Sequence, residues 1–148
     1  MALIWRDQMA VGHPVIDDDH RALIAIINDF EAEAERGAGV EALSTTLRRL
    51  HAYARDHFAR EEAVQARIGF PFHDAHAQEH RRLLAVVEEK ARGWFVTRTE
   101  PVTEQSLEEM AAMLRRWLVD HILRQDAGMR PYIKAARIAR KTAPPPAP

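Results

Sequence analysis

Apolar residues recur at spacings of three and four along four long stretches of the chain, and most glycines and prolines lie between these stretches. Residues at this spacing share one face of an α-helix. The first helix is predicted to follow Pro14 with Asp17 or Asp18 as its N-cap, and the second to run from about residue 41 to Ile68. The third is predicted to end near residue 92, and the fourth to begin after a Thr103 cap. No stretch alternates as a β-strand would.

Four amphipathic helices joined by short connections predict an all-α fold, an up-down-up-down antiparallel four-helix bundle. Residues 127–141 carry several basic side chains on a short predicted C-terminal helix. These side chains form a solvated face or, alternatively, a surface that docks on an acidic partner. The prolines of 142–148 exclude a helix there. We therefore expect one domain over residues 1–141 and a disordered Pro-rich tail at 142–148.

The composition narrows the class of protein further. The chain has 148 residues, with 21 basic and 22 acidic side chains, so it lacks the basic excess typical of nucleic-acid-binding proteins. It has no cysteine, which excludes thiolate metal sites and disulfides. Its apolar runs are far shorter than the ~20 residues that a spanning helix needs. We expect a cytoplasmic protein that binds neither nucleic acid nor membranes.

The inward stripe of every predicted helix is interrupted by histidine, and that of the second helix also by glutamate. One buried histidine alone is usually a core residue that is hydrogen-bonded to a backbone carbonyl. Several imidazoles buried with carboxylates destabilise a fold unless something compensates, and a bound metal ion is the usual compensation. The residues concerned are His20, His57, Glu61, His76, His80 and His121.

The positions of these side chains along their helices indicate that they meet at one end of the bundle. His20 lies about 16 residues before the end of its helix, and His57 about 16 residues after the start of the next. His76 lies about 16 residues before the third helix ends, and His121 about 17 after the fourth begins. All four therefore lie at the same level, roughly 25 Å along each helix.

The fourth helix breaks the regular spacing. Asp126 follows His121 by five residues, which places it about 140° around an ideal helix. Beyond Asp126, the inward stripe continues in phase through Met129 and Ile133. We therefore predict one inserted residue, a π-bulge between His121 and Met129, which is a feature common at functional sites.

The donor set favours iron, with manganese or zinc as less suitable ions, because it consists of imidazoles and carboxylates. Two octahedral ions need about twelve coordination positions. Five imidazoles, the two carboxylates of Glu61 and Asp126 as bridges, and one bridging oxide or hydroxide supply about eleven of them. One position is left for a small diatomic ligand.

Several motifs together resemble the hemerythrin family in its bacterial single-domain form. The resemblance spans about residues 5–133. Each motif alone is weak, but their combined spacing is highly specific. They are Trp5, Ile16-Asp17-Asp18-Asp19-His20, His57-Phe58-Ala59-Arg60-Glu61-Glu62, His76-Ala77-Gln78-Glu79-His80, and Trp117-Leu118-Val119-Asp120-His121-Ile122 followed by Asp126.

This resemblance implies a non-heme di-iron centre, that is two Fe ions with a bridging oxo or hydroxo group, inside the bundle. It also implies that O2 binds reversibly, as a hydroperoxide, at the open position of the iron that has two histidine ligands. The implied ligands are three histidines on one iron, two on the other and two bridging carboxylates: His76, His80 and His121; His20 and His57; and Glu61 and Asp126.

Helical geometry places four apolar residues beside the expected ligands. Ile24 lies one turn after His20, and Leu118 lies three residues before His121. Phe58 and Ile122 each follow a ligand directly. We expect these four residues to line an O2 pocket and to exclude water from it. Ordinary core packing is the alternative role, and both roles are compatible.

The chain departs from the family pattern at Asp19 and Met129, and also at Gly128 and Pro131, which break the usual Lys-rich continuation, and it has three histidines left over. Asp19 stands where the family often has Gln or Glu, and Met129 where it often has a Tyr that would alter the polarity of the pocket. We expect His13 and His51 to be solvated. His73 is in phase with the third-helix ligands and is an alternative ligand, although we expect it to precede the helix.

The expected function is O2 binding for storage, delivery or sensing, by a protein that is not an enzyme. The alternative is a di-iron oxidase, a peroxidase or a nitric-oxide-handling enzyme that uses the same site. Bundle di-iron oxidases combine four carboxylates with two histidines, whereas this chain offers five histidines and two carboxylates, which favours binding. An unidentified protein recipient of O2 is a further partner that the sequence leaves open.

Overall fold

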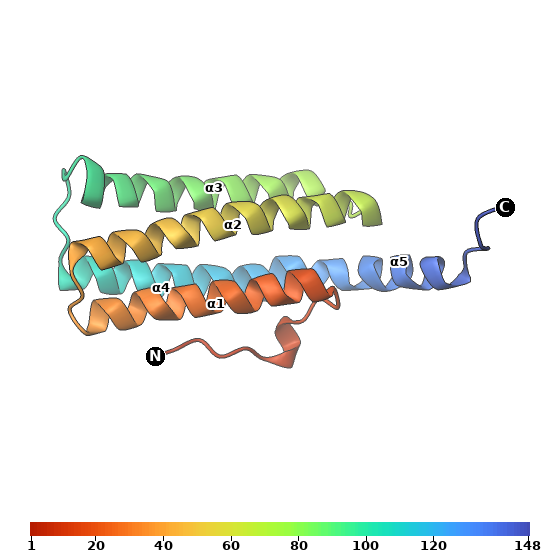
Figure 1. The fold of residues 1–148 in the computed structure, drawn as a ribbon, viewed down its shortest axis with the longest axis horizontal. Helices are drawn as coiled ribbons and strands as arrows, with labels where there is room; N and C mark the ends of the chain where they lie inside the picture. The colour runs from red at the N-terminus through yellow and green to blue at the C-terminus, as the bar shows by residue number, and fades with distance from the viewer.

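The computed structural model describes residues 1–148, which form helices and no β-strands. The four long helices are α1 (Pro14–Glu35), α2 (Val40–Ile68), α3 (His73–Ala91) and α4 (Glu104–Asp120). Successive helices run in opposite directions, which confirms the predicted up-down-up-down bundle (Figure 1). α1 packs beside α2 and α4, and α2 packs beside α3, whereas α3 and α4 approach each other less closely.

The start of α1 corrects the sequence prediction. The helix begins at Pro14 rather than after an Asp17 or Asp18 cap. Proline suits the first helical position because its φ is already helical and its missing N–H needs no partner there. Asp17 lies in the first turn, and its carboxylate accepts a hydrogen bond from the backbone N–H of Val11 at 2.8 Å. Asp17 thus holds the preceding loop instead of starting the helix.

The other helix ends follow from local sequence. α2 ends at Ile68, and the next residue, Gly69, has a φ of 67°, the left-handed conformation that terminates helices. α4 begins at the predicted Thr103 cap, where Thr103 and Ser106 exchange side-chain and backbone hydrogen bonds. This reciprocal pair satisfies two N–H groups that the first turn leaves unpaired.

The third helix is longer than the sequence predicted. α3 begins at His73, so this histidine lies inside the helix and not before it. At the other end, a π-helical segment, η2 (Arg92–Val96), carries the chain beyond the predicted end near residue 92. Gly93 and Trp94 are buried within η2.

The chain continues beyond α4 through two tight segments into a last helix. η3 (His121–Gln125) is π-helical, which confirms the predicted π-bulge between His121 and Met129. A 3₁₀ segment, η4 (Asp126–Met129), then leads into α5 (Arg130–Thr142). α5 projects past the end of the other helices (Figure 1). It includes Thr142, which we expected in the tail, and residues 143–148 form no helix; their disorder stays a prediction.

The N-terminal segment packs along α1. The backbone N–H of Leu3 donates to Asn28 Oδ1 at 2.7 Å, and Asn28 Nδ2 donates to the Leu3 carbonyl at 2.9 Å. The guanidinium of Arg21 lies 4.3 Å from the ring centroid of Trp5. A short 3₁₀ segment, η1 (Asp7–Met9), follows and buries Met9.

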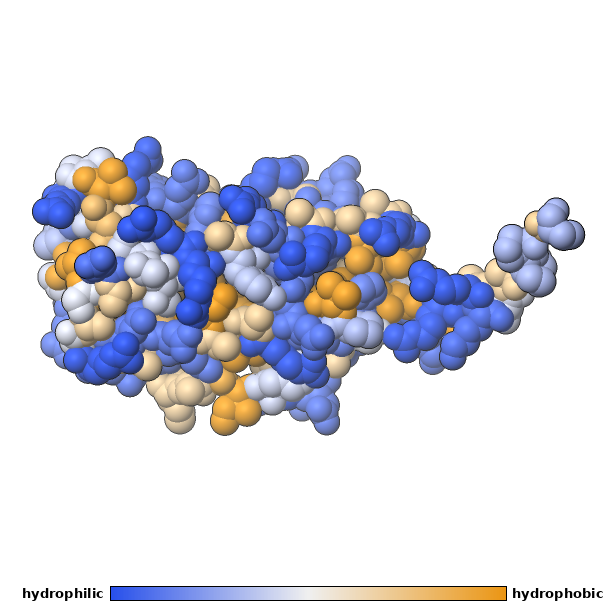
Figure 2. Space-filling model, in the orientation of Figure 1, coloured by the Kyte–Doolittle hydropathy of each residue, from blue (hydrophilic) through white to orange (hydrophobic).

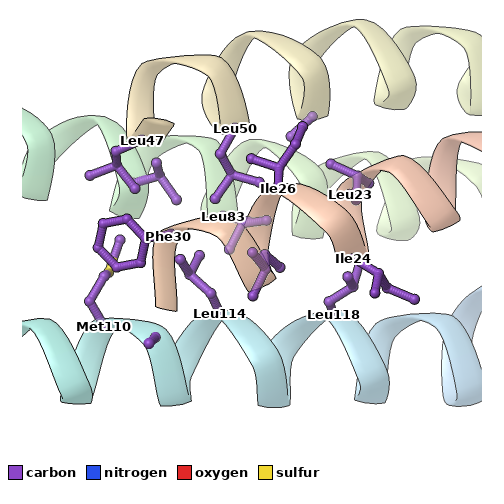
Figure 3. Close-up of a cluster of buried hydrophobic side chains, with 14 of the residues drawn as sticks. Leu23, Ile24, Ile26, Phe30, Leu47, Leu50, Leu83, Met110, Leu114 and Leu118 are labelled. Atoms are coloured by element: carbon purple, nitrogen blue, oxygen red, sulfur yellow. The ribbon is translucent and has the colours of Figure 1, made fainter. Parts of the chain in front are cut away.

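Two apolar clusters lie on opposite sides of the level at which the inward histidines occur. The larger one contains 20 buried residues and fills the bundle between all four helices (Figure 3). The smaller one closes the end of the bundle from which α5 leaves, and it consists of Val11, Ile16, Val64, Phe70, Met129 and Ile133. The polar residues between the clusters are therefore flanked by apolar side chains on both sides.

The visible face of the molecule is mainly hydrophilic, and apolar residues occur on it in small groups (Figure 2). The projecting α5 carries the strongly hydrophilic patch near the C-terminus in this view. No helix combines the length and the apolar composition needed to cross a bilayer.

Candidate metal centre

The structure brings all seven expected donors together in the bundle interior. α1 supplies one of them, α2 two, α3 two, and the end of α4 with η3 and η4 the last two. None exposes more than 3% of its surface. The seven are His20, His57, Glu61, His76, His80, His121 and Asp126.

Glu61 joins two groups of donors. One donor atom from each of Glu61, His76, His80 and His121 lies within 4.8 Å of the others, and the same holds for Glu61, His20 and His57. Glu61 Oε2 is 3.3 Å from His80 Nε2 and 3.5 Å from His57 Nε2. The same carboxylate therefore faces histidines of both groups.

Asp126 lies between the groups in the same manner. Its Oδ2 is 3.1 Å from His20 Nε2, in the group of two histidines. Its Oδ1 is 3.0 Å from His76 Nε2 and 3.1 Å from His121 Nε2, in the group of three. The π-helical turn makes this possible, because it turns the residue five positions after His121 back toward the bundle interior.

Several of the donor atoms lack the hydrogen-bond partners that buried polar atoms normally have. Both carboxylate oxygens of Glu61 and of Asp126 are buried and unpartnered, as are Nε2 of His20 and Nε2 of His76. In addition, Nε2 of His80 and Nε2 of His121 lie only 3.1 Å apart. Buried nitrogen and oxygen atoms that converge in this way without hydrogen-bond geometry are what a cation requires, so these residues fit a metal pair.

The pKa values of the cluster show how strongly these charges interact. Burial alone would lower the pKa of His76, but contacts with Asp126 and Glu61 outweigh it and raise that pKa to about 9. Burial alone would raise the pKa of Asp126, but the imidazoles of His121, His20 and His76 hold it well below its ordinary value. Without a metal, the raised pKa values of His20 and His76 favour protons on these two imidazoles, which balance the carboxylates, and a metal ion would replace those protons.

Two further carboxylates hold the outer nitrogens of ligand candidates. Asp19 Oδ2 lies 3.0 Å from His57 Nδ1, and Asp19 also accepts hydrogen bonds from Tyr53 Oη at 2.8 Å and from Arg60 Nε at 2.8 Å. Glu62 Oε1 lies 2.8 Å from His80 Nδ1. Burial would raise the pKa of Asp19, but these three hydrogen bonds lower it well below its usual range.

These outer carboxylates were missed as functional residues in the sequence. Both stand inside the quoted motifs, Asp19 next to His20 and Glu62 next to Glu61, but each pairs with a histidine on a different helix. An adjacent acidic residue on a helix is ordinarily solvated. The only sequence signal was their position beside a ligand, so their role could not be separated from that of a surface charge.

Aromatic rings fix the orientation of two imidazoles. Phe58 stacks on His80 with ring centroids 3.8 Å apart and an interplanar angle of 6°. Trp117 stacks on His121 at 4.7 Å and 17°. The four expected pocket residues are all buried in the larger apolar cluster, and they are Ile24, Phe58, Leu118 and Ile122.

The three remaining histidines lie outside the cluster. His73 Nδ1 pairs with Gln65 Oε1 at 3.2 Å, and Gln65 Nε2 donates in turn to the sulfur of the buried Met129 at 3.5 Å. His73 is thus engaged with a neutral amide and belongs to neither donor group. His13 and His51 are half-buried, which corrects the expectation that both are solvated.

Comparison with known proteins agrees with this geometry. The family model described as "Hemerythrin HHE cation binding domain" matches residues 11–133. The chain is 31% identical over 135 residues to a bacteriohemerythrin of Pseudomonas aeruginosa, covering 91% of this chain and 82% of that protein. It is 30% identical over 133 residues to a bacteriohemerythrin of Stenotrophomonas maltophilia, covering 90% and 82%.

A crystal structure of a hemerythrin variant has the same fold, with a TM-score of 0.78 over 90% of this chain and 98% of that chain, at 24% identity. The match of the family model extends over most of the chain and includes all seven donors. The chain therefore belongs to the hemerythrin family.

Proposed function

We propose that this protein binds two iron ions and, through them, O2 reversibly. The observation that carries the proposal is the set of buried, unpartnered donor atoms that form two groups sharing Glu61. Membership of the hemerythrin family supports iron as the metal and O2 as the ligand. The absence of thiolates from the donor set agrees with iron in a nitrogen and oxygen environment.

The distances support a specific division of roles. The three-histidine group would hold one iron, and the two-histidine group of His20 and His57 the other. Glu61 and Asp126 would bridge, because each has oxygen atoms near histidines of both groups. When bound, the iron pair supplies the reversible binding of O2.

The surrounding side chains would orient the histidines for metal binding and keep water away from them. A neutral imidazole carries one N–H, and a carboxylate beside Nδ1 holds the proton there. Asp19 and Glu62 therefore leave Nε2 of His57 and of His80 free to face Glu61. The buried apolar residues Phe58 and Leu118 exclude water from the same region.

The donor set also supports binding rather than catalysis. Bundle di-iron enzymes typically place four carboxylates and two histidines around the metals. Here five histidines and two carboxylates occupy the equivalent interior. We therefore propose an O2-binding protein that acts in storage, delivery or sensing and not an oxidase.

The proposal is tested by loading the protein with iron, counting the iron per chain, reducing it without oxygen and then adding O2. We expect two irons per chain and a visible absorption band that appears with O2 and disappears when O2 is removed, over repeated cycles. One iron or none would contradict the metal assignment. Rapid irreversible oxidation coupled to turnover of an added electron donor would instead identify an enzyme.

A further inference from the structure

The proposed O2 site is closed to solvent, so O2 needs a path through the protein. All seven donors expose 3% of their surface or less, and the pocket residues Ile24, Phe58, Leu118 and Ile122 expose 5% or less. Since O2 is apolar, it dissolves more readily in an apolar passage than in a polar one. Such a path for O2 rests on the proposed function, and the experiments below distinguish a failure of the path from a failure of that function.

A groove opens on the surface between α2 and α3, in the half of the bundle away from the metal centre. Its cavity measures about 410 Å³. The inner wall is apolar and the rim carries charged groups, among them Glu88 and Arg92. Its apolar wall comprises Leu47, Val87, Ala91, Phe95 and Val96.

A narrow void lies behind this groove, inside the bundle. Residues of all four helices line it, and all of them are apolar except His51. Its volume is about 10 Å³, close to the roughly 10–15 Å³ that a water-sized molecule needs by the same measure. Leu23, Leu50, Leu83, Leu114 and Leu118, which line the void, point into the bundle interior (Figure 3).

The groove and the void meet at two residues. His51 and Val87 border both cavities. His51 is half-buried, and its Nε2 lies 3.9 Å from the carboxylate of Glu88 on α3, at the rim of the groove. Val87 is 3% exposed and forms the inner part of the same constriction.

Residues that line the far side of the void lie next to the metal centre. Leu118 lines the void and lies one turn before His121. Trp117, which also lines it, stacks on the His121 ring at 4.7 Å. Ala54 lines it from α2, one turn before Phe58. The groove, the constriction, the void and the pocket therefore follow one another without a polar layer between them.

We propose that this sequence of cavities is the path by which O2 reaches the metal centre, with His51 and Val87 as its constriction. Apolar voids inside proteins stay dry and can take up small apolar molecules such as xenon. Water and ions are excluded from it because it offers them almost no hydrogen-bond partners. The path would thus admit O2 while it keeps the iron pair away from solvent.

A second cavity gives the competing path. It measures about 370 Å³ and reaches His76 from the end of the bundle. Its lining combines the apolar residues Phe70, Phe72 and Ala75 with the polar side chains of Gln78, Glu79, Arg124 and Gln125. The polar side chains offer hydrogen bonds to water and small anions, so this cavity is a wetter approach to the group of three histidines than the void between the four helices.

The first test uses xenon, an apolar gas, as a probe that does not depend on O2 chemistry. We expect a crystal of the iron-loaded protein under xenon pressure to show xenon between Leu83, Val87 and Leu118. In Val87→Phe, which fills the constriction, that xenon should be lost. Xenon only in the cavity beside His76, or nowhere, would overturn the path.

The second test measures O2 association and dissociation rates by stopped flow. In His51→Trp, both rates should fall by the same factor, about tenfold for an added barrier of about 1.4 kcal/mol, while the equilibrium constant stays unchanged. Val86→Trp also introduces a tryptophan, on α3, at a position that lines neither cavity. This control should leave both rates unchanged.

The outcomes separate the path from the proposed function. If the iron-loaded wild-type protein binds no O2, the proposed function fails, and the xenon experiment still decides whether the void admits an apolar gas. If O2 binds but His51→Trp leaves both rates as they were, the path is wrong. A change in the equilibrium constant would show that His51 acts on the bound state and not on access.

Discussion

Asp19 stands outside the donor cluster but acts on a residue inside it. Its carboxylate faces His57 Nδ1 and is itself held by Tyr53 and Arg60. Its negative charge keeps the His57 proton on the nitrogen that points away from the cluster. The low pKa of Asp19 means that this charge persists throughout the pH range in which the protein is handled.

Replacing Asp19 with Asn should weaken iron binding without removing any proposed ligand. We expect a loss of 10- to 100-fold in iron affinity, roughly the effect of removing a carboxylate partner from a ligating histidine, together with about 1–3 kcal/mol of unfolding free energy. Competition with a chelator and urea unfolding measure the two effects. Asp18→Asn is the matched control, because Asp18 is exposed and pairs only with Arg21; an equal loss in both variants would contradict this role.

The assignment of His121 as a ligand is tested against the alternative ligand His73. His121→Ala should reduce the iron content below two per chain, because it removes one of the three nitrogen donors around Glu61. His73→Ala should leave the iron content unchanged, since His73 pairs with Gln65. Elemental analysis of both loaded variants measures this. The opposite result would exchange the roles of the two histidines.

The sequence singled out the five candidate histidines because histidine is conspicuous on an otherwise apolar stripe. It did not predict the pairing of Glu62 with His80, or that of Asp19 with Tyr53 and Arg60. Those contacts join residues on different helices. Helical periodicity places a residue on a face of its own helix, but it does not specify the rotamer that a long polar side chain adopts against a neighbour.

At the level of the helices, the spacing of five between His121 and Asp126 was enough to predict a π-turn, and η3 confirms it. The helix starts were harder to predict. Asp17 is a residue type that often caps the start of a helix, but its carboxylate accepts a hydrogen bond from the backbone N–H of Val11 in the preceding loop. His73 follows a Gly-Phe-Pro-Phe segment that suggested a later start for α3. Different local signals favour different first residues of a helix, whereas a change of phase in a long apolar stripe indicates one inserted residue.

The π-turn makes a prediction about deletions. Removing Arg124, which is exposed within η3, should convert this turn to ordinary α-helix and leave Asp126 four residues after His121, still on the inward face. The variant should fold and retain two irons. Removing Arg116, which is exposed in the regular part of α4, rotates all later residues by about 100° and should abolish iron binding.

Circular dichroism and iron analysis of the two deletion variants decide the matter. Both deletions remove one exposed arginine from the same helix, so charge and length are matched. Equal loss of iron in both would mean that η3 has a role beyond restoring the phase of the stripe.

Across the whole molecule, the metal pair would link all four helices at one level, so its removal should affect global stability. Free iron at 100 times its dissociation constant would stabilise the fold by about 2.7 kcal/mol for each ion bound, and each such contribution corresponds to a rise in Tm of roughly 5–10 °C. Thermal unfolding with and without a chelator measures this. An unchanged Tm would indicate that the donors do not hold a metal in the folded state.

The same stability difference should depend on pH. In the metal-free protein, the pKa of His76 is raised to about 9, so its stabilising charge is fully present below about pH 6.5 and is lost as the pH rises through the folded value. The iron-loaded protein uses neutral imidazoles and does not depend on that charge. The difference in Tm between the iron-loaded and the metal-free protein should therefore widen from pH 6.5 to 9. A difference that narrows would contradict this role of the His76 charge.

The donors are spread along the chain from position 20 to position 126, on α1, α2, α3 and the segments η3 and η4 that follow α4. During synthesis, which adds about 5–20 residues per second, the first histidine leaves the ribosome well before the last carboxylate is made. A nascent chain that ends after α3 offers His20, His57, Glu61, His76 and His80, but it lacks His121 and Asp126. A complete cage thus exists only once Asp126 has been made, so both ions can be held together only after all four helices of the bundle have been synthesised.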